Sequence, residues 1–252
     1  MKVFVIIPAA GLGTRMAPSS DKDRRDSPSK QFKELGGIPI LVRTLRKFAA
    51  IPAVHQIVVA LRHDEIAPFR AQLERQFPEV LAKRLHLVAG GEHRQDSVAN
   101  ALAAIASNPN AVNPDAAYPD DLVLVHDAVR PFVTAETIHD VIAAAAKHGA
   151  AIAGWPAVDT IKQVDRTAEG AIIKTTIPRA GVVMAQTPQG FRYDVLKKAF
   201  DDAAADGFVG TDEASLIERA GQPVVVVMGS ASNIKITTPA DMELAEFYLK
   251  SG

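Results

Sequence analysis

The sequence contains no cysteine among its 252 residues. This absence excludes disulfide bonds, thiolate zinc sites, iron–sulfur clusters and a cysteine nucleophile. It is compatible with a protein of a reducing compartment.

An excess of basic charge is also absent, because 28 Lys and Arg side chains are balanced by 29 Asp and Glu side chains and the formal net charge is −1 at pH 7. Proteins that bind nucleic acid through the field of their whole surface are usually basic, so we expect no nucleic-acid partner. Any anionic ligand must therefore be held by a local cluster of cations.

Long hydrophobic runs are missing as well. No apolar segment approaches the roughly 20 residues that a membrane span requires. Residues 1–8 pass directly into a strand-like segment, without the longer apolar region and cleavage site of a secretory signal. We expect a cytoplasmic protein that does not associate with a membrane.

Short apolar runs alternate with longer helical patterns along the chain. The runs typical of buried strands are Val3–Pro8, Gln56–Leu61, Leu85–Ala89, Leu122–Val125, Ala150–Trp155, Val182–Gln186 and Val224–Met228. The helical patterns are Ile38–Ala49, Asp64–Phe77, Arg94–Ala106, Thr134–His148, Tyr193–Ala205 and Asp212–Ala220. This alternation predicts an α/β fold with a mostly parallel sheet covered by helices. A (β/α)₈ barrel is the alternative, and the long loop between the first strand and its helix counts against it.

One segment breaks this rhythm. Ile161–Val164 and Ile172–Thr176 alternate polar and apolar residues around a turn at Asp165–Gly170, which predicts a β-hairpin. An isolated two-stranded hairpin is only marginally stable in water, so this arm needs a partner surface, and we expect a contact with another chain. No linker divides the sequence, so we expect a single domain, residues 1–252, with residues 159–179 as a β-arm.

The first predicted strand leads into a loop that contains glycines, Pro8–Met16. Gly11 and Gly13 would let a ligand approach the backbone, whose N–H groups can hold phosphate oxygens. The loop matches neither the dinucleotide-binding fingerprint nor a Walker loop, because it lacks the third glycine and the Gly-Lys-Ser/Thr sequence. A tight turn is the alternative, and Arg15, two residues after Gly13, favours the binding of a polyphosphate.

A second candidate segment, Gly90–Ser97, follows a predicted strand and begins a helix. Its backbone N–H groups and the positive end of the helix dipole would favour an anion or a hydrogen-bonding base. Ordinary helix capping, with Ser97 in the first turn, explains the same residues equally well, so both interpretations remain open.

Charged side chains follow another predicted strand. Asp127 and Arg130 come after Leu122–Val125, and open α/β sheets bind ligands at the carboxyl ends of their strands. Asp127 could therefore hold Mg²⁺ bound to phosphates and Arg130 a second anion, although an Asp–Arg pair that braces a loop is the alternative. We expect His126 to be packed or hydrogen-bonded, since no second histidine has a metal-binding spacing.

Other candidates are weaker when taken one at a time. Lys30 lies in a polar loop, where a lysine is usually solvated. Lys235 is expected in the middle of a strand, between apolar neighbours, where its ammonium must find an anion or reach solvent. Thr238 can begin a final helix with Pro239 at its first position. The remaining candidates, each compatible with ordinary loop chemistry, are Asp159, Thr160, Arg179 and Gln186–Gln189.

Taken together, these segments resemble the 2-C-methyl-D-erythritol 4-phosphate cytidylyltransferase family. The matching pieces occur in the family's order and cover nearly the whole chain. They are Ala9–Met16, Lys30-Gln31, Gly90-Gly91 with Arg94 and Asp96–Val98, Val125–Ala128 with Arg130-Pro131, Asp159-Thr160, Gln186–Gln189, Thr211–Glu213 and Asn233–Thr237.

The resemblance implies a fold and a reaction. The fold would be a nucleotidyltransferase domain with a Rossmann-like, mostly parallel sheet, helices on both faces, and a projecting hairpin arm that crosses to the second subunit of a homodimer. The reaction would join CMP from CTP to methylerythritol 4-phosphate and release pyrophosphate, in isoprenoid precursor biosynthesis. A substrate phosphate is already a nucleophile at neutral pH, so the chemistry needs cations, a divalent metal such as Mg²⁺ and in-line geometry, but no general base.

The resemblance also implies roles for individual residues. Arg15 and Lys30 would stabilise the charge at the α-phosphorus, and Asp127 would bind the metal. CTP would contact Ala9, Ala10, Gly11, Gly13, Thr14, Gly91, Glu92, Ser97 and Ala128. The sugar phosphate would be held by Arg130, Thr160, Thr187, Lys235 and, from the arm of the neighbouring subunit, Arg179; the candidate catalytic residues are Arg15, Lys30, Arg179 and Lys235.

The chain departs from the family pattern near Lys30. Ser29 replaces the proline expected directly before this lysine, and the loop between Arg15 and Lys30 is longer than usual for the family. The alternatives left open are a sister cytidylyltransferase for ribitol 5-phosphate or another polyol phosphate, a more distant pyrophosphorylase that uses UTP or GTP, and a non-catalytic nucleotide-binding protein.

Overall fold

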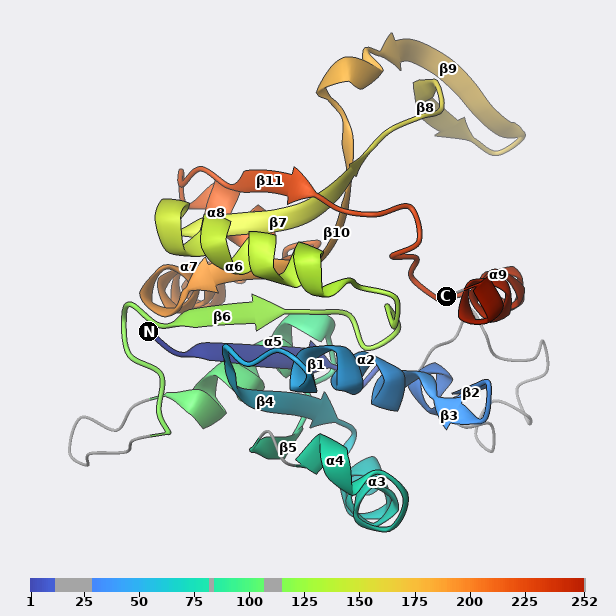
Figure 1. Ribbon diagram of the computed structural model, residues 1–252. Helices are drawn as coiled ribbons and strands as arrows, with labels where there is room; N and C mark the ends of the chain where they lie inside the picture. Colours follow the sequence, from blue (N-terminus) through green and yellow to red (C-terminus); the bar gives the residue numbers. More distant parts are fainter. Residues whose placement is uncertain (12–28, 82–83, 107–114, 252) are drawn as a thin grey trace.

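A seven-stranded sheet forms the centre of the fold (Figure 1), with the strand order β11-β7-β10-β6-β1-β4-β5. It is seen in a computed structural model, which describes residues 1–11, 29–81, 84–106 and 115–251. β1 pairs in parallel with β4 and β6, whereas β10 runs antiparallel to its neighbours β6 and β7. The prediction of a mostly parallel sheet is therefore confirmed. The strands are β1 (Val3–Pro8), β4 (Val54–Leu61), β5 (Leu85–Ala89), β6 (Leu122–Val125), β7 (Ala150–Pro156), β10 (Val183–Arg192) and β11 (Val225–Met228).

Helices cover both faces of this sheet, as predicted. One hydrophobic cluster joins the sheet to α2 (Ile40–Ala49), α3 (His63–Gln76) and α6 (Ala135–His148). A second cluster joins the opposite face to α5 (Arg94–Ile105), α7 (Tyr193–Ala205) and α8 (Glu213–Arg219). The described residues also form the short α4 (Pro78–Leu81) and the C-terminal α9 (Pro239–Ser251). None of the helices described is both long and apolar enough to span a bilayer.

The first strand shows why its sequence is apolar throughout. Val5 and Ile7 belong to the first hydrophobic cluster, whereas Phe4 and Ile6 belong to the second. Successive side chains of a strand point to opposite faces, so a strand covered by helices on both faces has no polar side.

Several helix ends agree with the sequence. At the start of α6, the Thr134 hydroxyl oxygen accepts a hydrogen bond from the N–H of Thr137 at 3.1 Å. Gly149 follows this helix with a φ of +88°, a left-handed conformation that glycine adopts without strain. At the start of α9, the Thr238 hydroxyl oxygen accepts from the N–H of Asp241 at 3.2 Å. These caps confirm the predicted boundaries.

The segment before α9 corrects one expectation, because residues 233–237 run as irregular backbone and not as a strand. The N–H of Ile236 donates to the carbonyl of Val129 at 3.0 Å, and Ile236 is fully buried in a third cluster with Val129, Leu35 and Ala245. The alternation of apolar residues that suggested a strand reflects this one-sided burial. It places Lys235 beside the loop that follows β6.

The predicted hairpin arm projects away from the central sheet (Figure 1). β8 (Ile161–Thr167) and β9 (Gly170–Ile177) form a separate antiparallel sheet of two strands. Ile172 and Ile173 in this arm are 65% and 61% exposed. Exposed apolar side chains grouped on a projecting arm are typical of an interaction surface. The hairpin is confirmed, whereas its contact with another chain stays a prediction.

Candidate active site

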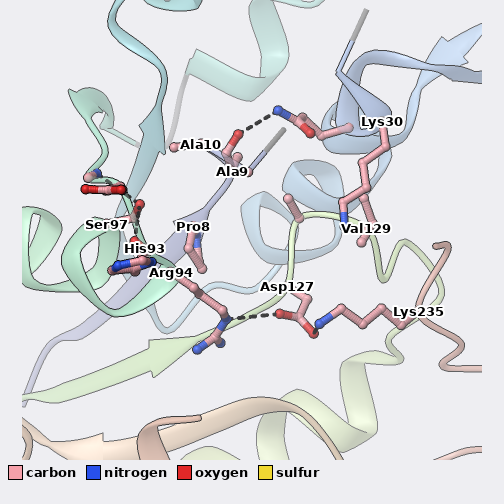
Figure 2. A pocket seen from close by; sticks show the side chains of 15 residues that line it. Pro8, Ala9, Ala10, Lys30, His93, Arg94, Ser97, Asp127, Val129 and Lys235 are labelled. Atoms are coloured by element: carbon pink, nitrogen blue, oxygen red, sulfur yellow. Dashed lines mark hydrogen bonds and ion pairs between the residues drawn. The ribbon is translucent and has the colours of Figure 1, made fainter. Parts of the chain in front are cut away.

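A pocket opens near the carboxyl ends of β1 and β6 (Figure 2). Its walls come from the end of β1, the short 3₁₀ helix η2 (Lys30–Phe32), the start of α5, the loop after β6 and the segment before α9. All described residues that the resemblance assigns to CTP line this pocket, together with the charged residues Lys30, Arg94, Asp127 and Lys235. The full lining is Pro8, Ala9, Ala10, Gly11, Lys30, Gln31, Gly91, Glu92, His93, Arg94, Ser97, Asp127, Ala128, Val129 and Lys235.

The start of α5 forms one wall of this pocket. The N–H of Gly91 donates to Ser97 Oγ at 3.1 Å, and the N–H of His93 donates to Asp96 Oδ2 at 2.9 Å. Helix capping, one of the two interpretations left open by the sequence, is therefore present, and the capped residues also line the pocket. A Cβ atom on Gly91 would lie 2.2 Å from the Cβ of Asp96, so only glycine fits this close approach.

Lys30 is held in the pocket by its two neighbours. Gln31 is almost fully buried, and its Nε2 donates to the carbonyl of Ala9 at 2.6 Å, which attaches η2 to the end of β1. On the other side, the Ser29 hydroxyl donates to Glu65 Oε1 in α3 at 2.7 Å. The residue that departs from the family pattern thus has a buried partner and forms part of the anchor of Lys30.

Asp127 lies among three cations, of which Figure 2 shows Arg94 and Lys235. Its Oδ2 is 3.0 Å from Lys235 Nζ and 3.3 Å from Arg130 Nε, and its Oδ1 is 3.5 Å from Arg94 Nε. Burial opposes the ionisation of Asp127, but these cations outweigh burial and hold its pKa well below its ordinary value. Asp127 is therefore ionised at neutral pH, and the four side chains together carry a positive charge.

A second pocket shares this cluster. Arg94, Asp127 and Lys235 line both pockets. An anion in either pocket would therefore face the same cations, which is the arrangement needed to bring two anions close together. The second pocket is lined by Arg94, Asp127, Arg130, Ala185, Gln186, Thr187, Gln189, Thr211, Asp212 and Lys235.

His126 is buried and links Arg130 to Thr187. Its Nε2 lies 3.0 Å from the carbonyl of Arg130, and its Nδ1 lies 3.1 Å from the hydroxyl of Thr187. Burial lowers the pKa of His126 to about 4, so the imidazole is neutral near pH 7. Because a carbonyl can only accept, Nε2 carries the proton and Nδ1 accepts from the hydroxyl. The prediction of a packed, hydrogen-bonded histidine is confirmed.

Some predicted site residues are not brought to these pockets. Thr160 and Arg179 are exposed at the base of the arm and line neither pocket. Arg179 Nη1 instead donates to the carbonyl of Val158 at 2.5 Å. The predictions for Gly13, Thr14 and Arg15 fall outside the described residues.

The sequence assigned no role to Arg94, although this residue connects the two pockets. A cation in the first turn of a helix is disfavoured by the helix dipole, so an arginine that begins α5 needs a nearby carboxylate. Glu213 supplies it, since its two carboxylate oxygens accept from Arg94 Nη1 and Nη2 at 2.6 and 2.9 Å. The unfavourable position of Arg94 is the signal that could have identified it.

Asp127 is the carboxylate that best fits a divalent metal. Among the residues that the structure describes, no group of three or more His, Asp and Glu side chains gathers in a way that could hold a metal ion. Mg²⁺ needs only one or two carboxylates where phosphates supply other ligands. The donor set at Asp127 therefore fits a metal shared with a bound triphosphate, but not one held by protein side chains alone.

Comparisons with known proteins identify the same family over nearly the whole chain. The family model described as IspD, 2-C-methyl-D-erythritol 4-phosphate cytidylyltransferase, matches residues 3–251. A protein of that name from Acidobacterium capsulatum is 55% identical over 251 residues, which are 99% of this chain and 98% of the relative. One from Solibacter usitatus is 49% identical over 250 residues, 99% of this chain and 96% of the relative.

Solved structures show the same likeness in three dimensions. The crystal structure of the 2-C-methyl-D-erythritol 4-phosphate cytidylyltransferase of Francisella tularensis superposes with a TM-score of 0.75 at 35% identity, covering 98% of this chain and 99% of that one. The enzyme of that name from Thermus thermophilus gives a TM-score of 0.73 at 32% identity, covering 99% and 100%. The sequence, the fold and the paired pockets thus lead to one assignment: the chain belongs to the 2-C-methyl-D-erythritol 4-phosphate cytidylyltransferase family.

Proposed function

We propose that this chain transfers CMP from CTP to 2-C-methyl-D-erythritol 4-phosphate and releases pyrophosphate, in the synthesis of isoprenoid precursors. The observation that carries the proposal is the pair of neighbouring pockets that share Arg94, Asp127 and Lys235. The reaction must bring a triphosphate and a sugar phosphate together, and two pockets with common cations suit that task. Membership of the family supports the identity of the two substrates.

The two pockets divide the substrates between them. The first would hold CTP against the backbone at the end of β1 and the start of α5, with Ala9, Ala10, Gly11, Gly91, Glu92, Ser97 and Ala128 as contacts. The second would hold the sugar phosphate against Arg130, Thr187 and Lys235. Gly13, Thr14 and Arg15 lie outside the described residues and remain predicted contacts of the triphosphate.

The proposed chemistry is an in-line displacement. An oxygen of the sugar phosphate forms a bond to the α-phosphorus of CTP, the bond from that phosphorus to the bridging oxygen breaks, and pyrophosphate leaves. The attacking phosphate is already ionised near pH 7, so no side chain has to remove a proton. The chain instead has to orient both anions and offset their repulsion, and Lys30 and Lys235 extend into the first pocket from different elements (Figure 2).

Asp127 is the residue that we propose as the protein ligand of Mg²⁺. When bound, the metal would neutralise part of the charge of the triphosphate. Because both oxygens of Asp127 already face cations, the carboxylate would exchange one of these contacts for the metal on substrate binding. The remaining ligands would come from the triphosphate and from water.

The arm supports a homodimer. Thr160 and Arg179 line neither pocket of their own chain, and both are polar, exposed and placed at the two ends of the projecting hairpin. We propose that residues 159–179 cross to a second copy of the chain and that Arg179 and Thr160 there contact the sugar phosphate. In this proposal, residues 1–252 form one nucleotidyltransferase domain, and the protein is cytoplasmic.

The function is tested by incubating the protein with CTP and Mg²⁺ and following pyrophosphate release. We expect fast release with 2-C-methyl-D-erythritol 4-phosphate and slow release with ribitol 5-phosphate. Replacement of CTP by UTP or GTP should reduce the rate. Preferential use of ribitol 5-phosphate would assign the chain to another polyol phosphate, and tight CTP binding without pyrophosphate release would indicate a non-catalytic protein.

A first mutational prediction concerns Ser29, which has a φ of −54°. This φ lies within the range that a proline ring imposes. We expect Ser29→Ala to lower kcat a few-fold, because the anchor of Lys30 loses a hydrogen bond of about 1 kcal/mol. Ser29→Pro should retain a kcat near that of the unchanged protein, because the ring restrains the same φ. Steady-state kinetics with saturating CTP and sugar phosphate measure both values.

The matched control is Ser251→Ala at the exposed end of α9, where the hydroxyl donates to the carbonyl of Phe247. Its kcat should not change. Equal losses in both Ser29 variants would show that the hydroxyl, and not the backbone angle, positions Lys30. An unchanged kcat in Ser29→Ala would show that the hydrogen bond to Glu65 does not position Lys30.

A further inference from the structure

Glu213 is a buried carboxylate that touches neither pocket, yet it holds the arginine that lines both. It is the first residue of α8 and is 2% exposed. Its two oxygens accept from the two terminal nitrogens of Arg94, whose remaining nitrogen, Nε, faces Asp127 at 3.5 Å. One guanidinium therefore stands between two carboxylates, closely paired with one and loosely with the other.

The length of the contact between Arg94 and Asp127 determines how strongly Asp127 is engaged. A charge-assisted hydrogen bond between nitrogen and carboxylate is usually about 2.7–2.9 Å long, so 3.5 Å leaves Asp127 Oδ1 only weakly engaged by Arg94. If the guanidinium of Arg94 were released from Glu213, it would form a much closer ion pair with Asp127. Its terminal nitrogens lie 2.6 and 2.9 Å from the oxygens of Glu213, and these two contacts hold the guanidinium away from Asp127.

The position of Glu213 is itself fixed by the sheet. Asp212, directly before it, accepts from the N–H of Ser215 at 3.0 Å and from Gln189 Nε2 at 2.7 Å. Gln189 Oε1 in turn accepts from the N–H of Ala214 at 3.1 Å. The first turn of α8 is thus fastened to β10, and a carboxylate mounted on it has little freedom to follow Arg94 toward the pockets.

We propose that Glu213 is a positioning residue of the transfer site, which keeps Arg94 from closing on Asp127 and so leaves Asp127 free to orient Lys235 and to accept an incoming ligand. This inference rests on the proposed function, because it explains how Arg94 and Lys235 keep the positions in which both can face the two substrates. In the absence of Glu213, the guanidinium would pair fully with Asp127. Lys235 would then lose part of its hold at Oδ2 and shift away from the place where the two pockets meet.

The primary test is Glu213→Gln, which keeps the shape of the side chain but removes its charge. We expect kcat with CTP and sugar phosphate to fall about ten- to a hundredfold, in the range seen when the supporting partner of a functional group is lost, while the Kd of CTP changes little. Glu79→Gln is the matched control, because Glu79 forms an exposed pair with Arg46 at 2.6 Å and neither residue lines either of the two pockets. Its kcat should be unchanged.

A double variant separates positioning from stability. Arg94→Met with Glu213→Leu replaces a buried ion pair by apolar side chains, an exchange that often preserves stability because no unpaired charge remains. We expect its Tm to recover relative to Glu213→Gln, and its kcat to match that of Arg94→Met alone, because Glu213 acts only through Arg94. A further loss of kcat beyond that of Arg94→Met would overturn the proposal, since Glu213 would then act in some other way.

A crystal structure of Glu213→Gln gives a readout that does not depend on the reaction. We expect a terminal nitrogen of Arg94 within hydrogen-bond distance of Asp127, and an unchanged Arg94 would overturn the proposal. The proposed function and the positioning role of Glu213 can therefore be contradicted independently. Absence of turnover in the unchanged protein would contradict the proposed function, whereas unchanged kcat or an unmoved Arg94 in Glu213→Gln would contradict the positioning role.

Discussion

Replacing Lys235 by methionine is expected to lower kcat by about 10²–10³, which is the range for loss of one fixed electrostatic donor at a reacting centre. Lys235 is the amine closest to Asp127, at 3.0 Å from Oδ2, and it lines both pockets. Methionine keeps most of the apolar stem of the side chain, so the change removes mainly the charge. The two substrate phosphates would then lose one of the two cations that line both pockets.

The folded protein should tolerate this exchange. Asp127 keeps Arg94 and Arg130 as partners, so no buried carboxylate is left unpaired, and Tm should change little. Lys250→Met, in the exposed last turn of α9, is the matched control and should leave kcat unchanged. Steady-state kinetics with both substrates saturating decide the matter. A Lys235→Met protein with nearly full kcat would show that Lys235 does not act at the transferring phosphorus.

The regular elements could be predicted because their sequence signals are local. The alternate residues of β1 pack on opposite faces of the sheet, and Thr134 and Gly149 mark the two ends of α6 as expected. The hairpin arm was visible for the same reason, since its alternation of polar and apolar residues is complete within one segment. Patterns of this kind depend on neighbouring residues only.

The sequence identified several residues of the site but not the contacts between them. The strand expected around Lys235 is absent, because Ile236 is buried against Val129, a contact between residues more than a hundred positions apart. The pairing of Arg94 with Glu213 is equally remote in sequence. No local pattern reports such contacts, so the sequence could name Asp127 and Lys235 as candidates but could not show which cations surround the carboxylate.

Ser29 illustrates the opposite case, in which a departure from the family pattern became intelligible only in the structure. From sequence, a serine in place of proline weakened the assignment of Lys30. The structure gives the serine a proline-like φ and a hydrogen bond to Glu65. In this chain, the hydrogen bond of the serine side chain accompanies the φ that a proline ring would impose. A comparison of residue types alone does not reveal this equivalence.

The second large effect concerns the arm. Arg179→Ala should lower kcat/KM for the sugar phosphate by about 10², because a cation that contacts the phosphate is lost, while the Kd of CTP stays close to that of the unchanged protein. Arg179 lines neither pocket of its own chain, so the effect would have to act in a second copy. Asp127→Ala should lose at least as much activity, since its three cations are left without their common carboxylate.

Mixing the two inactive proteins tests whether the arm crosses between subunits. In a mixed dimer, the Arg179→Ala body keeps Asp127 and receives the intact arm of its partner, so one of the two sites is complete. Random exchange of equal amounts makes about half of the dimers mixed, and the mixture should recover about a quarter of the activity of the unchanged dimer. Native mass spectrometry verifies that mixed dimers are present. If they form and activity stays at the level of the parent variants, each site is built from a single chain, and Arg179 would have to act on its own site through a movement of the arm.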